Sequence, residues 1–162
     1  MNSLNHLRKL EDSQRGDENE GKGLYLLNGH PMRTGSVNEV FAWCTCRDTV
    51  RDEYLLRMFE GTDTIVRISD PMELARRIIR AFKLLPWRLY LHSGRVRYTR
   101  GKSVTKHTLN NQLWHFNIFQ KEGRFKPQRE YRFSLTIVGR KRIDEDHLDL
   151  ELGYCGDIIS II

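Results

Sequence analysis

The chain of 162 residues contains few cysteines. They are Cys44, Cys46 and Cys155, an odd number in which the first two are separated by one residue. This spacing fits neither a disulfide framework nor a usual zinc site, so we expect reduced thiols. In a strand Cys44 and Cys46 point to the same face, where free cysteines mostly behave as small core hydrophobes. A metal-binding or nucleophilic role is the alternative.

Long apolar runs are also missing. No stretch approaches the roughly 20 apolar residues that cross a bilayer, and the N-terminal sequence MNSLNHLRKLEDSQ lacks the apolar run of a signal peptide. We therefore expect a cytoplasmic protein with no membrane partner. The six histidines are scattered without a ligand spacing, so no metal site is predicted. The chain has no Walker loop, Rossmann glycine pattern or nucleophile elbow.

The composition is that of one globular domain. Hydrophobic residues make up 39% of the chain and charged residues 30%, and the length is close to the usual size of a single domain. Leu4, Leu7 and Leu10 have helical spacing, but the following residues are polar and charged. We predict a short helix and flexible arm over 1–22 and a single α+β domain over 23–162.

The charge is unevenly distributed, although the net charge is only +6. Residues 86–142 hold fourteen Lys and Arg against two Glu, a net charge of +12, whereas 143–162 hold six Asp and Glu and no Lys or Arg. A basic block of this size attracts polyanions such as nucleic acid, a nucleotide or an acidic protein. The alternative is that the acidic end folds back and neutralises part of the block.

Hydrophobic periodicity predicts a mostly antiparallel sheet with two or three helices packed on it. The clearest helix start is Asp70-Pro71-Met72-Glu73, which combines a capping acid, a proline at the first helical position and Glu three residues after the cap. That helix should run to about Leu84, with Met72 and Ile79 among its apolar residues and Arg77 facing water. The other expected helices are one that is capped by Asp48 or Thr49 and runs through Glu60, and one over 108–120.

Six stretches are predicted to be strands: 23–27, 40–46, 64–68, 130–138, 147–152 and a centrally paired 158–162. Turn-rich residues follow 23–27 and are expected to form a loop. A hairpin is predicted for 87–91 and 95–99 around a His-Ser-Gly turn. The strand 130–138 alternates apolar and polar residues and should be half-buried.

The segment Phe119–Phe133 (FQKEGRFKPQREYRF) carries the most chemistry. Pro127 disfavours a helix before it, and an extended chain places Gln128, Glu130 and Arg132 on one face. A Gln-x-Glu pair at the mouth of a strand can hydrogen-bond a ribose while the carboxylate stabilises a developing cation. The alternative is a same-face ion pair of Glu130 and Arg132 on a solvated sheet surface.

Several blocks of the C-terminal half resemble a family of uncharacterised bacterial and phage proteins. The blocks are Phe119-Gln120-Lys121, Phe125–Phe133, Leu148–Gly153 and Gly156-Asp157-Ile158, with earlier counterparts at Phe41–Cys46, Ile65–Ile68, the helix after Asp70-Pro71, and Gly94–Tyr98. The resemblance covers the chain from about Gly23 to the end. It implies no activity.

The Gln-x-Glu motif also resembles, more distantly, the catalytic strand of mono-ADP-ribosyltransferases. That resemblance implies an enzyme that uses NAD, in which Glu130 stabilises the ribosyl oxocarbenium ion and Gln128 orients the acceptor. The candidate NAD-binding residues are Arg67, Arg97 and Arg132. In such an enzyme Glu130→Gln should abolish activity and leave the fold almost untouched.

The second hypothesis is a non-catalytic module that binds nucleic acid or an acidic protein through a basic sheet face. The candidate polyanion-binding residues are Arg88, Arg95, Arg97 and Arg129. Aromatic residues such as Tyr90 lie between the basic ones and offer stacking faces. Arginine on exposed strands also serves solubility and edge protection, so both hypotheses stay open.

Overall fold

The structure is a computed structural model of the chain. The residues that it describes are 1–3, 6, 7, 21, 23–34, 39–59, 61–83, 85, 88–98, 117–138 and 146–162. The strands are β1 (Asn2–Ser3), β2 (Gly23–Leu27), β3 (His30–Thr34), β4 (Glu39–Cys46), β5 (Val66–Ile68), β6 (Arg88–Arg95), β7 (Glu130–Val138) and β8 (Ile159–Ile161). The helices are α2 (Asp52–Met58), α3 (Pro71–Phe82) and the 3-10 helix η1 (Gly123–Gln128).

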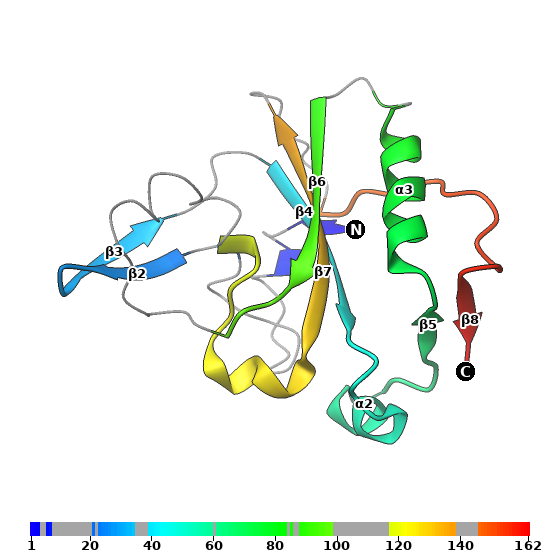
Figure 1. Ribbon diagram of the computed structural model, residues 1–162, viewed down its shortest axis with the longest axis horizontal. Helices are drawn as coiled ribbons and strands as arrows, with labels where there is room; N and C mark the ends of the chain where they lie inside the picture. Colours follow the sequence, from blue (N-terminus) through cyan, green and yellow to red (C-terminus); the bar gives the residue numbers. More distant parts are fainter. Residues whose placement is uncertain are drawn as a thin grey trace.

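The main sheet has four antiparallel strands in the order β1-β4-β7-β6 (Figure 1). At one end of the central pair, Cys46 of β4 lies opposite Glu130 of β7. On the other side of β7, Arg95 of β6 lies opposite Tyr131. The C-terminal ends of β4 and β6 therefore lie beside the start of β7. This architecture confirms the predicted α+β class with a mostly antiparallel sheet.

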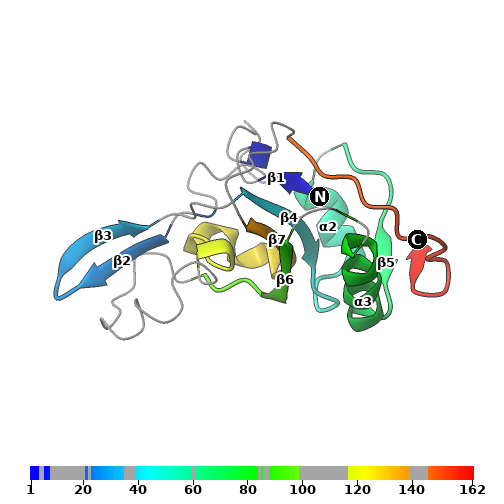
Figure 2. The same cartoon turned by 90° about the horizontal axis from the view of Figure 1, so that it is seen from above.

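A hairpin of β2 and β3 projects away from the main sheet (Figure 2). The strand over 23–27 is confirmed, but the expected loop after it is wrong because 30–34 forms the second strand. Asn28 and Gly29 connect the two strands with φ angles of 51° and 79°. Asn-Gly is the preferred pair for a two-residue hairpin turn with positive φ, because both residues tolerate that backbone region.

Helix α3 covers one face of the main sheet (Figure 1). Asp70 caps it as predicted, since its Oδ1 accepts hydrogen bonds from the backbone N–H groups of Met72 at 3.0 Å and Glu73 at 2.9 Å. Met72 and Ile79 lie at the edge of the apolar side and are 60% and 43% exposed. The main core contains Leu74, Ala75, Ile78 and Phe82 of α3 with Phe133, Leu135 and Ile137 of β7.

The opposite face of β7 is polar and also buried, which corrects the prediction of a half-buried strand. Glu130, Arg132, Ser134 and Thr136 alternate with the core residues, and each is at most 6% exposed. The residues from 117 to 128, which include η1, lie on this face of the sheet (Figure 1). A polar row that reads as solvent-facing in the sequence is therefore inside the protein.

The predicted hairpin over 87–99 is wrong, because β6 is one uninterrupted strand. Its supposed turn residues, His92, Ser93 and Gly94, all pair with β7 inside the ladder. Gly94 passes close to Phe119, since a Cβ atom on Gly94 would lie 3.8 Å from that ring. The residue types favour a turn, but the neighbouring strand β7 runs alongside all three residues and offers hydrogen-bonding partners to their backbone groups.

The last strand is peripheral, so the predicted central pairing of 158–162 is wrong. β8 pairs with β5 in a separate two-stranded sheet, and Ile161 is 76% exposed. Leu148, Leu150 and Leu152 contact the main core, as their alternation predicts, but they lie outside any strand. The alternation of these leucines correctly predicted which side of the segment is buried, but it did not predict whether the segment pairs with another strand.

The N-terminal residues are part of the fold. β1 pairs with β4, the Ser3 N–H donates to the carbonyl of Asp146 at 2.7 Å, and the Leu148 N–H donates to that of Met1 at 2.7 Å. Met1–Ser3 thus completes an edge of the main sheet, while the flexible arm over 1–22 stays a prediction. Most of the predicted arm over 1–22 lies outside the described residues, as does most of the expected helix 108–120.

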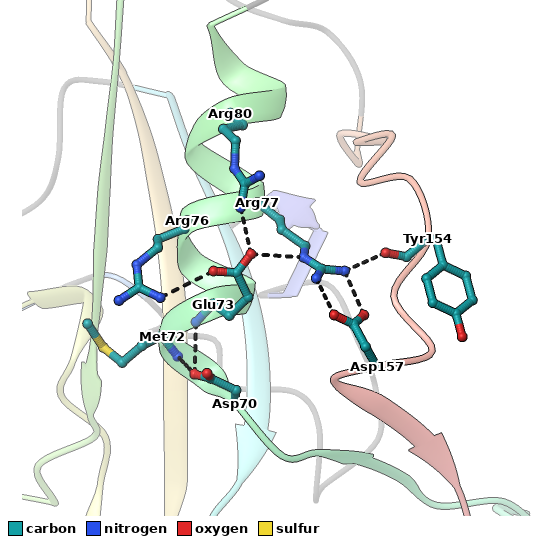
Figure 3. A network of polar contacts seen from close by, with 8 residues as sticks. All are labelled: Asp70, Met72, Glu73, Arg76, Arg77, Arg80, Tyr154 and Asp157. Carbon is teal, nitrogen blue, oxygen red and sulfur yellow. Dashed lines mark hydrogen bonds and ion pairs between the residues drawn. The ribbon is translucent and has the colours of Figure 1, made fainter.

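Arg77 joins α3 to the C-terminal segment (Figure 3). Its guanidinium donates to the carboxylate of Asp157 at 2.9 and 2.5 Å and to the carbonyl of Tyr154. Glu73 accepts from Arg77 at 3.2 Å and from Arg80 at 2.5 Å. The Arg77 side chain is 15% exposed, so the prediction that it faces water is wrong. Asp157, the last acid of the chain, thus pairs with a residue outside the basic block.

Candidate functional site

The segment Phe119–Phe133 does not follow an extended path from Pro127 onward. Pro127 lies inside η1, which ends at Gln128. Arg129 then adopts left-handed backbone angles, with φ 44° and ψ 47°, and the ladder begins at Glu130. A short 3-10 helix accommodates the proline because few of its N–H groups need partners.

Four polar side chains meet beneath the polar face of β7. We call Lys121, Gln128, Glu130 and Arg132 the buried charge cluster. Lys121 Nζ lies 2.5 Å from Glu130 Oε1 and 3.2 Å from Gln128 Oε1. Arg132 Nε and Nη2 lie 2.8 and 2.7 Å from Glu130 Oε2. Arg132 Nη1 also donates to the carbonyl of Ile118 at 2.6 Å.

The cluster is almost completely removed from water: Lys121 is 3% exposed, Gln128 2%, Glu130 6% and Arg132 0%. The predicted same-face pair of Glu130 and Arg132 is present, but it lies in the interior and not on a solvated surface. Gln128 joins the pair from the end of η1. Buried charges of this kind are tolerated only when they are paired and hydrogen-bonded.

The carboxylate of Glu130 is held in its charged form. Burial alone raises its pKa, but the charges of Arg132 and Lys121 and their hydrogen bonds together outweigh burial and hold the pKa below its ordinary value. Each carboxylate oxygen carries one of the two cations. The backbone N–H of Glu130 donates to the hydroxyl of Tyr98 at 2.8 Å, and burial raises the pKa of Tyr98 to about 12.

Cys46 lies opposite Glu130 in the ladder. Burial, reinforced by the charge of Glu130, raises the pKa of its thiol to about 11. A thiol with that pKa is protonated at neutral pH and is a poor nucleophile or metal ligand. Cys44, two residues earlier, is exposed, so the expectation that both cysteines are core residues is wrong for Cys44.

The residues assigned to NAD chemistry do not form one open site. Both oxygens of Glu130 are occupied by cations, so neither is offered to a bound ribose. Arg132 is inside the cluster, while Arg67 on β5 is exposed and pairs with Asp52 at 3.3 Å. Arg97 is exposed beyond the end of β6. The assignment of NAD chemistry to Gln128 and Glu130 stays a prediction.

Three of the four predicted polyanion-binding arginines share one end of the main sheet. Arg95 ends β6, Arg97 follows it, and Arg129 precedes β7, with the N–H of Val96 donating to the carbonyl of Glu130. Arg88 is at the other end of β6, opposite Val138. Because seven positions separate Arg88 from Arg95, these two side chains also point to opposite faces. The four arginines therefore do not line a single face.

The shared end gathers further cations that the sequence did not single out. α2 and η1 both lie here, below the strand ends in Figure 1. The backbone N–H of Arg47 donates to the carbonyl of Arg129. The side chain of Arg129 donates to the carbonyl of Thr49 at 3.3 Å. The surface cations of this end, which we call the basic end, are Arg47, Arg51, Arg57, Arg95, Arg97, Arg124, Lys126 and Arg129.

The basic end contains a hollow of about 350 Å³ between α2 and η1. Its lining residues are Tyr54, Arg57 and Met58 from α2 and Arg124, Pro127 and Gln128 from η1. Gln128 thus belongs both to the hollow and to the buried charge cluster. The sequence did not identify Tyr54 and Arg57 as candidate site residues, because both lie outside the basic block. Their helical i, i+3 spacing is the only signal that places them together.

Within the described residues, no group of His, Cys, Asp and Glu is arranged to hold a metal ion, and no helix has the length and apolar character needed to cross a membrane. Comparison of the chain with family models, with curated proteins and with solved structures gave no match.

Proposed function

We propose that the protein is a binding module for nucleic acid and that the basic end contacts the phosphate backbone. The observation that carries this proposal is the convergence of eight surface cations from segments far apart in the sequence. The same segments carry only four surface acids, Asp48, Asp52, Glu53 and Glu122. Two of these pair with arginines at 3.3 Å each: Asp52 with Arg67, which is not one of the eight, and Glu122 with Arg124, which is.

The kind of cation supports phosphate as the ligand. Seven of the eight are arginines, whose planar guanidinium matches a phosphate through two parallel hydrogen bonds. They come from the loop before α2, from α2 itself, from the end of β6 and from η1, so they form a patch and not a row on one strand. A patch of one sign attracts a polyanion and raises its association rate.

An acidic protein is the competing partner, and the distribution of apolar surface disfavours it. Protein interfaces usually contain an apolar centre that becomes fully buried. Among the described residues, six of the ten large exposed hydrophobic side chains lie on α3, β5 and the C-terminal segment, and two, Tyr54 and Leu56, lie on α2 at the basic end. The six are Met72, Ile79, Val66, Tyr154, Ile161 and Ile162.

Fluorescence anisotropy with a labelled oligothymidylate tests the proposal. We expect binding whose log K falls linearly with log salt, and Arg95→Ala should reduce that slope by about 0.7, the effect of one lost phosphate contact on a single strand. Arg88→Ala is the matched control, because Arg88 is exposed on the same strand at the opposite end. The proposal fails if the oligonucleotide does not bind at about 50 mM salt, or if oligo-glutamate binds more tightly.

A further inference from the structure

The hollow at the basic end has two unlike walls. On α2, Tyr54, Arg57 and Met58 share one side of the helix, since they are three and four residues apart. Tyr54 is 47% exposed. The η1 wall is lined by Pro127 and Arg124. The hollow therefore combines an aromatic ring, apolar surface and two cations, and none of its lining residues is acidic.

The residues of the η1 wall are held in place by contacts with residues that do not line the hollow. Lys121 binds the side chain of Gln128 within the buried charge cluster. Arg124 pairs with Glu122 at 3.3 Å, and its guanidinium lies 4.5 Å from the centre of the buried Phe125 ring. A cation fixed in this way loses little side-chain entropy when it binds a ligand.

The α2 wall is less firmly packed. None of its residues is fully buried, and among the described residues Arg57 makes no ion pair. The bond from Arg129 to the carbonyl of Thr49 ties the loop before α2 to the end of η1. The two walls are thus linked at one side, while Tyr54 and Arg57 are free to adjust to a ligand.

These features match the chemistry of one unpaired nucleotide. A base stacks on an aromatic ring through its π face, and guanidinium groups bind the adjoining phosphate. A volume of about 350 Å³ is at the small end of the ~300–1,000 Å³ typical of ligand sites, which suits a single base. An acidic peptide would satisfy the arginines and leave the ring without a stacking partner.

We infer that the hollow is a subsite for one unstacked base with its phosphate, so that the basic end binds single-stranded nucleic acid. This inference rests on the proposed function. It assigns Tyr54 as the stacking residue, Arg57 and Arg124 as the phosphate-binding residues, and Met58 and Pro127 as the apolar walls. A base in a duplex is already stacked and paired, and it does not enter the hollow.

The test compares two labelled single strands with the same number of phosphates, an oligothymidylate and an abasic oligonucleotide, on the full chain. The wild type should bind the oligothymidylate more tightly. Tyr54→Ala should weaken that binding about tenfold, leave abasic binding unchanged and leave the salt slope unchanged. Tyr54→Phe, which keeps the ring, should bind as the wild type does.

The outcomes separate this inference from the proposed function. If both strands bind with equal affinity and strong salt dependence, or if Tyr54→Ala binds like the wild type, the base subsite is wrong and backbone binding stands. If neither strand binds at about 50 mM salt, the proposed function itself fails. Tyr54 is half-exposed, so thermal melting of Tyr54→Ala should match the wild type and exclude a folding defect.

Discussion

Lys121 Nζ lies 2.5 Å from Glu130 Oε1, and both side chains are almost fully buried. Arg132 occupies the other oxygen of the same carboxylate. One buried anion thus serves two buried cations. Compared with apolar side chains of similar volume in the same place, such a cluster adds little to the free energy of unfolding. The loss of its single anion, however, leaves two uncompensated positive charges in the interior.

Glu130→Gln should therefore destabilise the protein by about 3 kcal/mol, which for a chain of this length lowers Tm by roughly 6–12 °C. The cluster thus changes the expectation from the sequence that this substitution leaves the fold almost untouched. Glu122→Gln is the matched control, because Glu122 pairs with Arg124 at the surface and should change stability by less than about 0.5 kcal/mol. Equal melting temperatures for the two variants would contradict the role of the cluster.

The stabilisation by Glu130 should depend on pH in the acidic range. Its pKa is lower in the folded protein than the value of about 4.3 expected in the unfolded chain. The stabilisation is fully present above the unfolded value and is lost as the pH falls through the folded value. Urea unfolding should show that the stability difference between wild type and Glu130→Gln is constant above about pH 6 and shrinks below about pH 4. A difference that stays constant down to pH 2 would be inconsistent with a lowered pKa.

The two cysteines of β4 should differ in reactivity. At pH 8 a thiol with a pKa of about 11 is ionised in roughly one molecule in a thousand, and Cys46 is also half-buried. Exposed Cys44 should therefore react with iodoacetamide well before Cys46. Fragment-ion mass spectrometry distinguishes the two sites, which share one tryptic peptide. Equal labelling in the native state, with Cys44 and Cys46 equally reactive in urea, would show that Cys46 is accessible.

The Arg77–Asp157 pair should control the local stability of the C-terminal segment. Arg77→Lys removes the paired hydrogen bonds to Asp157 and keeps the charge. We expect faster hydrogen exchange at the backbone amides of Ile159 and Ile162 in this variant, with a much smaller effect on the core strands. Arg76→Lys is the control, since Arg76 contacts only Glu73 on its own helix among the described residues. Unchanged exchange at Ile159 would mean that apolar packing alone holds the segment.

The sequence predicted the features that depend on near neighbours along the chain. The cap of α3 is an example, because Asp70 needs only the N–H groups two and three residues ahead of it. The side of β7 that forms the core follows in the same way from strict alternation. Those signals do not depend on what packs against the element.

The sequence misplaced what depends on contacts across the fold. Gln128, Glu130 and Arg132 were predicted to lie together, but not that residues 117–128 fold over them, so a polar row that looks solvent-facing is buried with Lys121. Likewise, the charge pattern along the chain identified the basic block 86–142 but not Arg57, and it does not point to the uncharged Tyr54.

The sequence by itself thus determined the α+β class, the helix cap of α3, the alternation of β7 and an excess of arginine. Only the tertiary structure decided which charges are interior and which converge at the basic end. The physical reason is that a charge is stabilised by whatever surrounds it in three dimensions. For Glu130 a main contribution comes from Lys121, which is nine residues away and reaches the carboxylate because the segment 117–128 packs on the polar face of β7.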